Sequence, residues 1–227
     1  MRIGNRNFDT KNNTYIMGIL NATPDSFSDG GKFNTVDKAM YHVGEMIRDG
    51  ASIIDIGGES TRPGHKQITD QEEIERVLPM IEAVKANFDV PVSLDTYKSD
   101  VALAGIEAGA DMINDIWGLK YDGKLAKIIA ERNVACCLMH NRDSKEYHAL
   151  ILEVKAELME SVDIALTAGI AKNRIMIDPG IGFGKTYEQN LEALARLEDF
   201  KVLGLPVLLG TSRKSVIGLT LNLPADQ

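Results

Sequence analysis

The stretch ASIIDIGGEST, residues 51–61, shows the pattern that decides the fold. A short apolar run, Ser52–Ile56, leads directly into glycine, carboxylate and hydroxyl residues. Such a run is typical of a strand that is buried on both faces, as in a parallel sheet. The amphipathic stretch Gln71–Ala86 follows and indicates a helix. Together these features predict one strand–helix unit with a polar loop after the strand.

The same unit repeats along the chain. The predicted strands are Tyr15–Leu20, Ser52–Ile56, Val90–Leu94, Met112–Ile116, Val134–Met139, Arg174–Ile177 and Pro206–Leu209. The predicted helices are Val36–Arg48, Gln71–Ala86, Ser99–Glu107, Lys124–Glu131, Lys145–Ala168, Glu188–Glu198 and Ser212–Leu219. Seven units without a linker predict one α/β domain, residues 1–227, with the architecture of a TIM (β/α)8 barrel. A doubly wound sheet would instead have a glycine-rich turn after its first strand, where this chain has NATPDSFSDGG.

The eighth unit of the barrel is not found. The chain ends at LNLPADQ, residues 221–227, shortly after the seventh predicted helix. A closed barrel of this kind needs an eighth strand and helix, about 35–45 further residues. We therefore expect the domain to be incomplete at its C-terminal end, through truncation rather than as a natively open barrel.

Composition excludes several classes of protein. The 227 residues include 25 basic and 33 acidic side chains, and the net charge of −8 argues against nucleic acid as a partner. No apolar run reaches the roughly 18 residues of a membrane span. The polar start MRIGNRNFDTKNN is unlike a secretory signal, and the adjacent Cys136 and Cys137 cannot form a disulfide framework. We expect a cytoplasmic protein.

Polar side chains follow nearly every predicted strand. In parallel barrels, catalytic groups gather at the carboxyl ends of the strands. Any one of these residues could equally cap a helix or start a turn, but their recurrence favours a site. The strand-end residues are Asn21, Asp55, Glu59, Asp95, Asn114, Asp115, His140, Asp178 and Lys214.

Two loops add to this signal. Residues 20–31, LNATPDSFSDGG, have the composition of a mobile binding loop. The motif GTSRKS, residues 210–215, brings Arg213 and Lys214 to the start of a helix, where backbone N–H groups and cations bind anions. In an acidic chain this cluster of cations predicts an anionic ligand.

Two other motifs are misleading. PGIGFGKT, residues 179–186, resembles a nucleotide-binding P-loop, but that motif requires a glycine where Pro179 stands. Cys136, Cys137 and His140 resemble a metal site, yet neighbouring residues of a strand point to opposite faces. We expect no nucleotide triphosphate at the first motif, and we expect the cysteines to be buried packing residues.

Several segments together resemble one enzyme family. They are MGILNATPDSFSDGG, GASIIDIGGESTRPG, PVSLDTYKS, INDIWG, CLMHNR, IDPGIGFGKT and LLGTSRKS, in this order between about residues 15 and 220. The chain resembles the dihydropteroate synthases, the folate-pathway transferases that sulfonamides inhibit. The resemblance implies that 6-hydroxymethyl-7,8-dihydropterin diphosphate and p-aminobenzoate give 7,8-dihydropteroate and pyrophosphate, with Mg²⁺ assisting.

The resemblance also implies a role for each site residue. Carboxylates accept hydrogen bonds from the amino and ring N–H groups of a pterin, and an amide can both donate and accept. Asp95, Asn114, Asp178 and Lys214 are thus implied as the catalytic pterin-binding residues, and Asp55 as a support behind them. Met139 and Phe183 are implied to pack around the pterin ring, and Asn21 to ligate Mg²⁺. The residues implied for the diphosphate and p-aminobenzoate are Phe27, Asp29, Thr61, Arg62, Pro63, Lys214 and Ser215.

The chain departs from the family at its end. The family has an Arg-x-His motif in its eighth strand, which holds the diphosphate, and no such motif follows residue 220. We therefore expect a pterin pocket that persists in outline with weak or absent catalysis. The resemblance further implies a homodimer that uses late helices.

Three alternatives stay open at this point. A pterin-binding methyltransferase domain shares the Asp and Asn residues but lacks the loops DSFSDGG, GESTRPG and SRKS, all of which this chain has. A non-catalytic pterin-binding paralogue would have lost those loops. An unrelated phosphate-binding aldolase-type barrel would need a Schiff-base lysine at a strand end, whereas Lys214 lies just past its strand.

Overall fold

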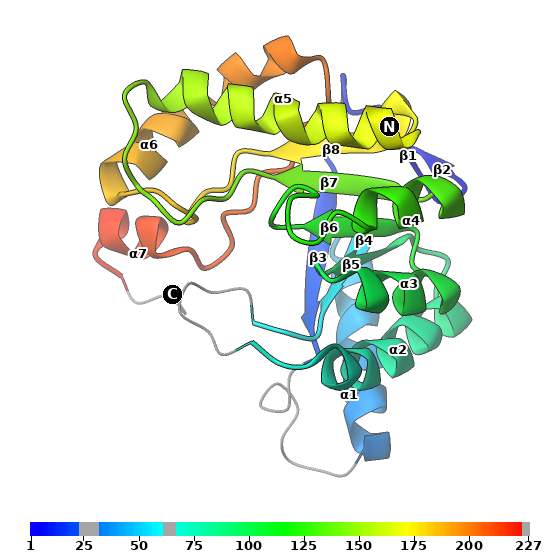
Figure 1. The fold of residues 1–227 in the computed structure, drawn as a ribbon. Coiled ribbons are helices and arrows are strands. Elements are labelled where there is room, and N and C mark those ends of the chain that lie inside the picture. The colour runs from blue at the N-terminus through cyan, green and yellow to red at the C-terminus, as the bar shows by residue number, and fades with distance from the viewer. Residues whose placement is uncertain (23–31, 61–66, 224–227) are drawn as a thin grey trace.

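The fold is a parallel sheet wrapped by helices. A computed structural model describes residues 1–22, 32–60 and 67–223. The strands form one sheet in sequential order: β3 (Ile16–Asn21), β4 (Ala51–Gly57), β5 (Val92–Asp95), β6 (Met112–Asp115), β7 (Ala135–Met139) and β8 (Ile175–Asp178). The helices are α1 (Lys32–Arg48), α2 (Asp70–Asn87), α3 (Ser99–Glu107), α4 (Leu125–Arg132), α5 (Leu150–Ala168), α6 (Tyr187–Ala195) and α7 (Ser215–Leu221). Figure 1 shows them around the outside of the curved sheet, as the α/β barrel architecture predicts.

The seventh predicted strand, Pro206–Leu209, is wrong in extent. The structure reduces it to one parallel bridge between Ile177 and Val207. Two backbone hydrogen bonds accompany that bridge, from Ile177 to Pro206 at 3.0 Å and from Leu208 to Ile177 at 2.8 Å. Among the described residues this segment pairs only with β8. Within the described part of the chain it therefore lies at an edge of the sheet, with one neighbour instead of two.

Several predicted helices also differ in extent from the observed ones: α1 begins four residues before Val36, and α7 begins three residues after Ser212. The helix expected from Lys145 begins only at Leu150, because a Glu153 carboxylate oxygen accepts the backbone N–H groups just before the helix. The helix expected over Glu188–Glu198 ends at Ala195 as α6, and a 3₁₀ segment, Leu197–Leu203, follows. Another 3₁₀ turn, Lys172–Arg174, precedes β8.

A short hairpin at the N-terminus was not expected from the sequence. It joins β1 (Arg2–Ile3) to β2 (Arg6–Asn7), and two-residue strands give no periodic signal. Ile3 and Phe8 pack against the inward side chains at the amino end of the sheet, including Met112. The hairpin therefore closes the end of the sheet opposite the strand carboxyl ends (Figure 1).

Strand alternation sorts the side chains into two sets. Outward residues of the strands pack under the helices: Ile54, Ile56, Leu94, Ile113, Cys136, Leu138 and Ile177. Inward residues near the amino end form a second cluster: Ile53, Met112, Ala135, Cys137 and Met176. The two cysteines are thus buried on opposite faces, as their adjacency predicts. No helix in the described part of the chain is long and apolar enough to cross a membrane.

Candidate functional site

The strand register brings polar side chains to one inner layer. Asn21 pairs with Gly57, Gly57 with Asp95, and Asp95 with Asn114. Residues paired across parallel strands point to the same face, so these side chains all point inward at the carboxyl ends. Gly57 lies directly beside Asp95 in this row, since a Cβ atom at Gly57 would be in ordinary van der Waals contact, 3.6 Å, with the Cβ of Asp95.

Asp55 lies deeper on the same inner face, two residues before Gly57. The Asn114 side-chain nitrogen donates to an Asp55 carboxylate oxygen at 3.2 Å. Burial raises the pKa of Asp55 to about 6, against hydrogen bonds that lower it. Asp55 therefore orients the Asn114 amide, which agrees with the support implied by the resemblance.

Among the carboxyl groups of this layer, Asp95 has a strongly raised pKa. Burial raises its pKa well above the ordinary value, and the negative charge of Asp55 raises it further, while Lys214 lowers it. Its oxygen Oδ1 is buried and has no hydrogen-bond partner among the described residues. A buried acceptor without a partner is costly, which makes this atom suited to a donor from a ligand.

Asp178 and Lys214 form the other side of the layer. Asp178 of β8 pairs with Met139 of β7. The Asp178 oxygen Oδ1 accepts the backbone N–H of Gly180 at 2.7 Å. Burial raises the pKa of Asp178 to about 6, against that hydrogen bond and the nearby charge of Lys214. The Lys214 ammonium lies 4.0 Å from the centre of the Phe183 ring, a cation–π distance.

An apolar cluster lies beside these polar groups. Met139 and Phe183 are buried there together with Tyr97 and Ile116, and Trp117 packs against them. Flat aromatic and sulfur-containing side chains suit the faces of a planar ring. The arrangement thus combines edge acceptors with an apolar wall, as a small planar heterocycle requires.

The remaining predicted residues are placed as follows. Asn21 is exposed at the end of β3, and Ser215 is exposed as the first residue of α7. Lys214 was expected at the start of a helix, and it is the N-cap residue immediately before α7. Five implied residues lie outside the described part of the chain: Phe27, Asp29, Thr61, Arg62 and Pro63.

Three of the strand-end residues serve the fold instead. Asp115 points outward and accepts the backbone N–H groups of Trp117 at 2.8 Å and Leu119 at 2.6 Å, which fixes the turn after β6. Glu59 is buried against Lys98, at 2.7 Å between charged atoms. His140 lies between Lys185 and α5.

The sequence reasoning missed two buried lysines. Lys98 bridges Glu59 and Glu73, its ammonium 2.8 Å from the latter, and all three side chains are almost completely buried. Lys185 donates to backbone carbonyls of its own turn, so its ammonium does not point to a phosphate. The sequence did not indicate a structural role for Lys185, because a lysine after a glycine-rich turn is usually a ligand contact.

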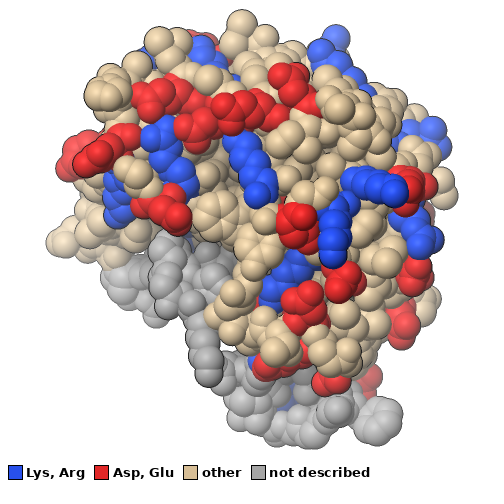
Figure 2. All heavy atoms as spheres, viewed as in Figure 1, with Lys and Arg blue, Asp and Glu red and all other residues tan. Residues whose placement is uncertain are grey.

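The charge on the surface is mixed. Figure 2 shows acidic side chains gathered over α5 and basic ones scattered between acidic groups, without a continuous basic face in this view. This distribution agrees with the net charge of −8.

Asn21 is the described residue suited to a metal in this layer. The described residues contain no group of three His, Cys, Asp or Glu side chains that could hold an ion. Mg²⁺ commonly takes one or two protein oxygens and completes its shell with water and substrate phosphates. The exposed amide of Asn21 fits that kind of site, in which the substrate supplies most ligands.

The chain matches known proteins over nearly all its length. Residues 17–227 match a family described as "Pterin binding enzyme". Dihydropteroate synthase of Clostridium beijerinckii is 60% identical over the whole chain, which covers 84% of that protein. A crystal structure of dihydropteroate synthase from Clostridium difficile, obtained in the presence of pteroic acid, has a TM-score of 0.93 and 49% identity, with 96% of this chain and 84% of that one covered. The synthase of Xanthomonas albilineans with 4-aminobenzoic acid has a TM-score of 0.87 and 45% identity, over 93% of this chain and 78% of that one.

Proposed function

Because the chain belongs to the pterin-binding enzyme family and has the function of a dihydropteroate synthase, we propose that the inner layer of Asp95, Asn114, Asp178 and Lys214 binds the dihydropterin substrate. The reaction condenses 6-hydroxymethyl-7,8-dihydropterin diphosphate with p-aminobenzoate and releases pyrophosphate. This function replaces the methyltransferase and aldolase alternatives. The observation that carries our assignment is the unpartnered, buried Oδ1 of Asp95 in a row of inward polar groups.

The chemistry of the pterin supports each contact. Its amino and ring N–H groups donate, which suits the carboxylates of Asp95 and Asp178, while its ring carbonyl accepts, which suits Lys214. Asn114 is held by Asp55 and presents the rest of its amide to the ring edge. Met139 and Phe183 pack on the ring faces.

The bond changes follow from this placement. The bond from the exocyclic carbon to oxygen breaks, and its electron pair leaves with diphosphate. The amine nitrogen of p-aminobenzoate forms the new bond to that carbon and then loses a proton to water. The carboxylates of Asp95 and Asp178, beside the pterin, stabilise the positive charge that develops on its ring system. Mg²⁺ held by Asn21 would neutralise charge on the departing diphosphate.

The contacts to the other substrate rest on the resemblance. We propose that Lys214 and Ser215 border p-aminobenzoate together with Phe27, Asp29, Thr61, Arg62 and Pro63. A cytoplasmic location and a homodimer also stay predictions of the resemblance.

Calorimetry with 6-hydroxymethyl-7,8-dihydropterin diphosphate tests the pterin assignment. Wild type should bind, and Asp95→Ala should lose about tenfold or more in affinity, because a ligand donor then faces no acceptor. Asp115→Ala removes a completely buried aspartate of the next strand that points outward, and the folded variant should bind as wild type does. Equal affinity of wild type and Asp95→Ala would overturn the assignment.

Pyrophosphate release tests the reaction itself. The purified chain is mixed with Mg²⁺ and dihydropterin diphosphate, with and without p-aminobenzoate. Release that depends on the amine supports the synthase. Binding of pterin without release would favour the non-catalytic alternative for this chain.

A further inference from the structure

The buried side chain of Lys185 has no part in the contacts described so far. It ends the turn after β8 and is 4% exposed. Its ammonium nitrogen lies 3.0 Å from the Gly180 carbonyl oxygen, 3.1 Å from that of Phe183 and 3.0 Å from Nδ1 of His140. Burial lowers the pKa of Lys185 to about 7, so below that pH the side chain is an ammonium and these contacts use its three donors.

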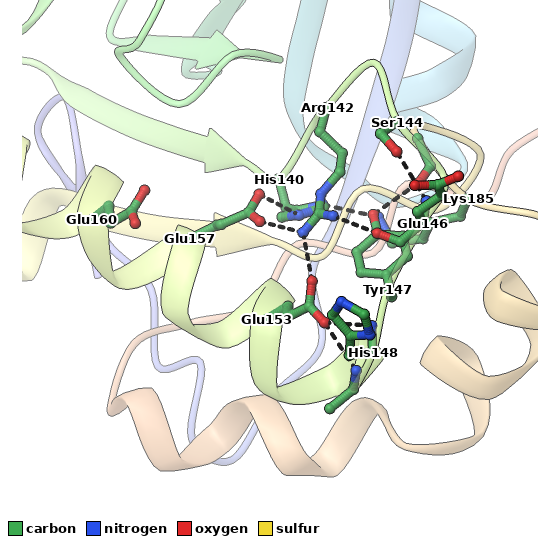
Figure 3. A network of polar contacts seen from close by, with 12 residues as sticks. His140, Arg142, Ser144, Glu146, Tyr147, His148, Glu153, Glu157, Glu160 and Lys185 are labelled. Atoms are coloured by element: carbon green, nitrogen blue, oxygen red, sulfur yellow. Dashed lines mark hydrogen bonds and ion pairs between the residues drawn. The ribbon is translucent and has the colours of Figure 1, made fainter.

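His140 links Lys185 to α5, as Figure 3 shows. Because Lys185 donates to Nδ1, the ring proton is on Nε2, which lies 3.0 Å from a Glu157 carboxylate oxygen. Burial lowers the pKa of His140 to about 3, and the charges of Lys185 and Arg142 lower it as well, so the ring stays neutral. Arg142 in turn pairs with Glu157, which fixes the outer end of the chain of contacts.

The turn also contacts the loop after β7 through its backbone. Gly180 has φ +70°, and a Cβ atom there would lie 1.9 Å from the carbonyl oxygen of His140. Gly184 has φ +52°, and a Cβ atom there would lie 2.5 Å from the carbonyl oxygen of Arg142. Only glycine allows this approach, which brings the carbonyls of the turn within reach of Lys185.

The turn carries two elements of the proposed pterin pocket. The N–H of Gly180 holds one oxygen of Asp178, and Phe183 presents its ring to Lys214. Lys185 binds the carbonyls of these same two residues. Lys185 is therefore hydrogen-bonded to the backbone of the two residues that contact Asp178 and Lys214.

We propose that Lys185 is a positioning residue for pterin: by holding the carbonyls of Gly180 and Phe183 against His140, it fixes the Asp178 carboxylate and the Phe183 ring in binding orientation. The inference rests on the proposed function, which puts pterin at these two groups. The side chain itself touches no substrate.

Lys185→Met is the decisive variant, because methionine has a similar length and no donors. Lys127→Met is the matched control, since it removes the same charge from a side chain that is 76% exposed on α4. We expect Lys185→Met to weaken binding of dihydropterin diphosphate in calorimetry by about tenfold, because two buried carbonyls lose their donor. Its KM for the same substrate should rise similarly, while kcat and the KM for p-aminobenzoate change by less than about twofold. Lys127→Met should match wild type throughout.

Amide hydrogen exchange gives a readout that needs no substrate. The Gly180 amide should exchange faster in Lys185→Met than in Lys127→Met, since the turn that holds it against Asp178 is released. Where Lys185→Met does not fold, Lys185→Gln keeps two donors and should show intermediate values of both quantities.

The outcomes separate this inference from the proposed function. Unchanged pterin affinity, or equal rises of both KM values, would overturn the positioning role while leaving pterin binding intact. Wild type that binds no pterin would overturn the proposed function, and with it the role in binding. Unchanged Gly180 exchange in a folded variant would show that Lys185 does not hold the turn.

Discussion

Replacement of Asp178 by asparagine should make the protein more stable at neutral pH and less able to bind pterin. Burial raises the pKa of this carboxyl from 3.8 to about 6, so folding opposes its ionisation. The Gly180 N–H that it accepts can donate equally to an asparagine oxygen. Asp178→Asn therefore removes the cost of a buried charge and keeps the turn.

The magnitude follows from the two pKa values. A carboxyl whose folded pKa lies above its unfolded value favours the folded state fully below pH 3.8, and this contribution is lost as the pH rises through about 6. The whole shift corresponds to about 3 kcal/mol, of which about 2 kcal/mol is lost between about pH 4.5 and 7.5. The unfolding free energy of wild type should thus fall relative to Asp178→Asn by about 2 kcal/mol over that interval.

Urea unfolding of both proteins at the two pH values measures this difference directly. Other ionisable groups are common to the two proteins and largely cancel in the comparison. Asp163→Asn removes a charge from an exposed position on α5 and should track wild type at both pH values. A gap between wild type and Asp178→Asn that is equal at both pH values would refute the reasoning.

Pterin binding gives the opposite sign for the same variant. An asparagine offers one acceptor where the carboxylate offers two, and its amide donor faces the donors of the ligand. We expect an affinity loss of about tenfold or more in calorimetry at neutral pH. Asp178→Asn with both higher stability and full pterin affinity would exclude Asp178 from the pocket.

Three further changes test neighbouring parts of the argument. Asn114→Ala should weaken pterin binding by about tenfold in calorimetry, because a positioned amide is lost. Gly180→Ala should lower the unfolding free energy by more than about 2 kcal/mol, since a Cβ meets a backbone oxygen at 1.9 Å; Gly123→Ala, with φ +70° and open space around it, should cost only about 1 kcal/mol. Lys98→Met should destabilise the fold by about 3–5 kcal/mol in urea unfolding, because two buried glutamates lose their cation, whereas Lys127→Met on the surface should cost under about 1 kcal/mol.

The sequence predicted which strands and helices exist better than it predicted where each of them begins and ends. Six of the predicted strands are present, because a continuous apolar run identifies a buried parallel strand without further context. The bridge at Val207 shows what such a run cannot reveal: whether a neighbour is available to pair with it. The hairpin at Ile3 was not predicted for a related reason: it depends on contacts with residues far along the chain, such as Met112.

The site was predictable in its residue types and less so in their directions. Asn114 and Asp115 are adjacent at the end of β6, and both are polar strand-end residues. Only the two-residue alternation separates them, because Asn114 shares a face with its partner Asp95 and Asp115 does not. Lys185 could not be predicted, because its role depends on the approach of a second loop to within hydrogen-bond distance.

The cost of the inward carboxylates supports the role that we propose for the inner layer. Asp115 is completely buried, yet two backbone N–H groups occupy its oxygens, so the fold itself satisfies it. Asp95 has an oxygen that the described part of the protein leaves without a donor, and Asp178 keeps a raised pKa despite two nearby lysines. A fold selected for stability alone would fill these positions with apolar side chains. The acceptors left open inward, beside an apolar wall, are those that a ligand with several N–H groups on one edge can satisfy, and the pterin ring has that edge.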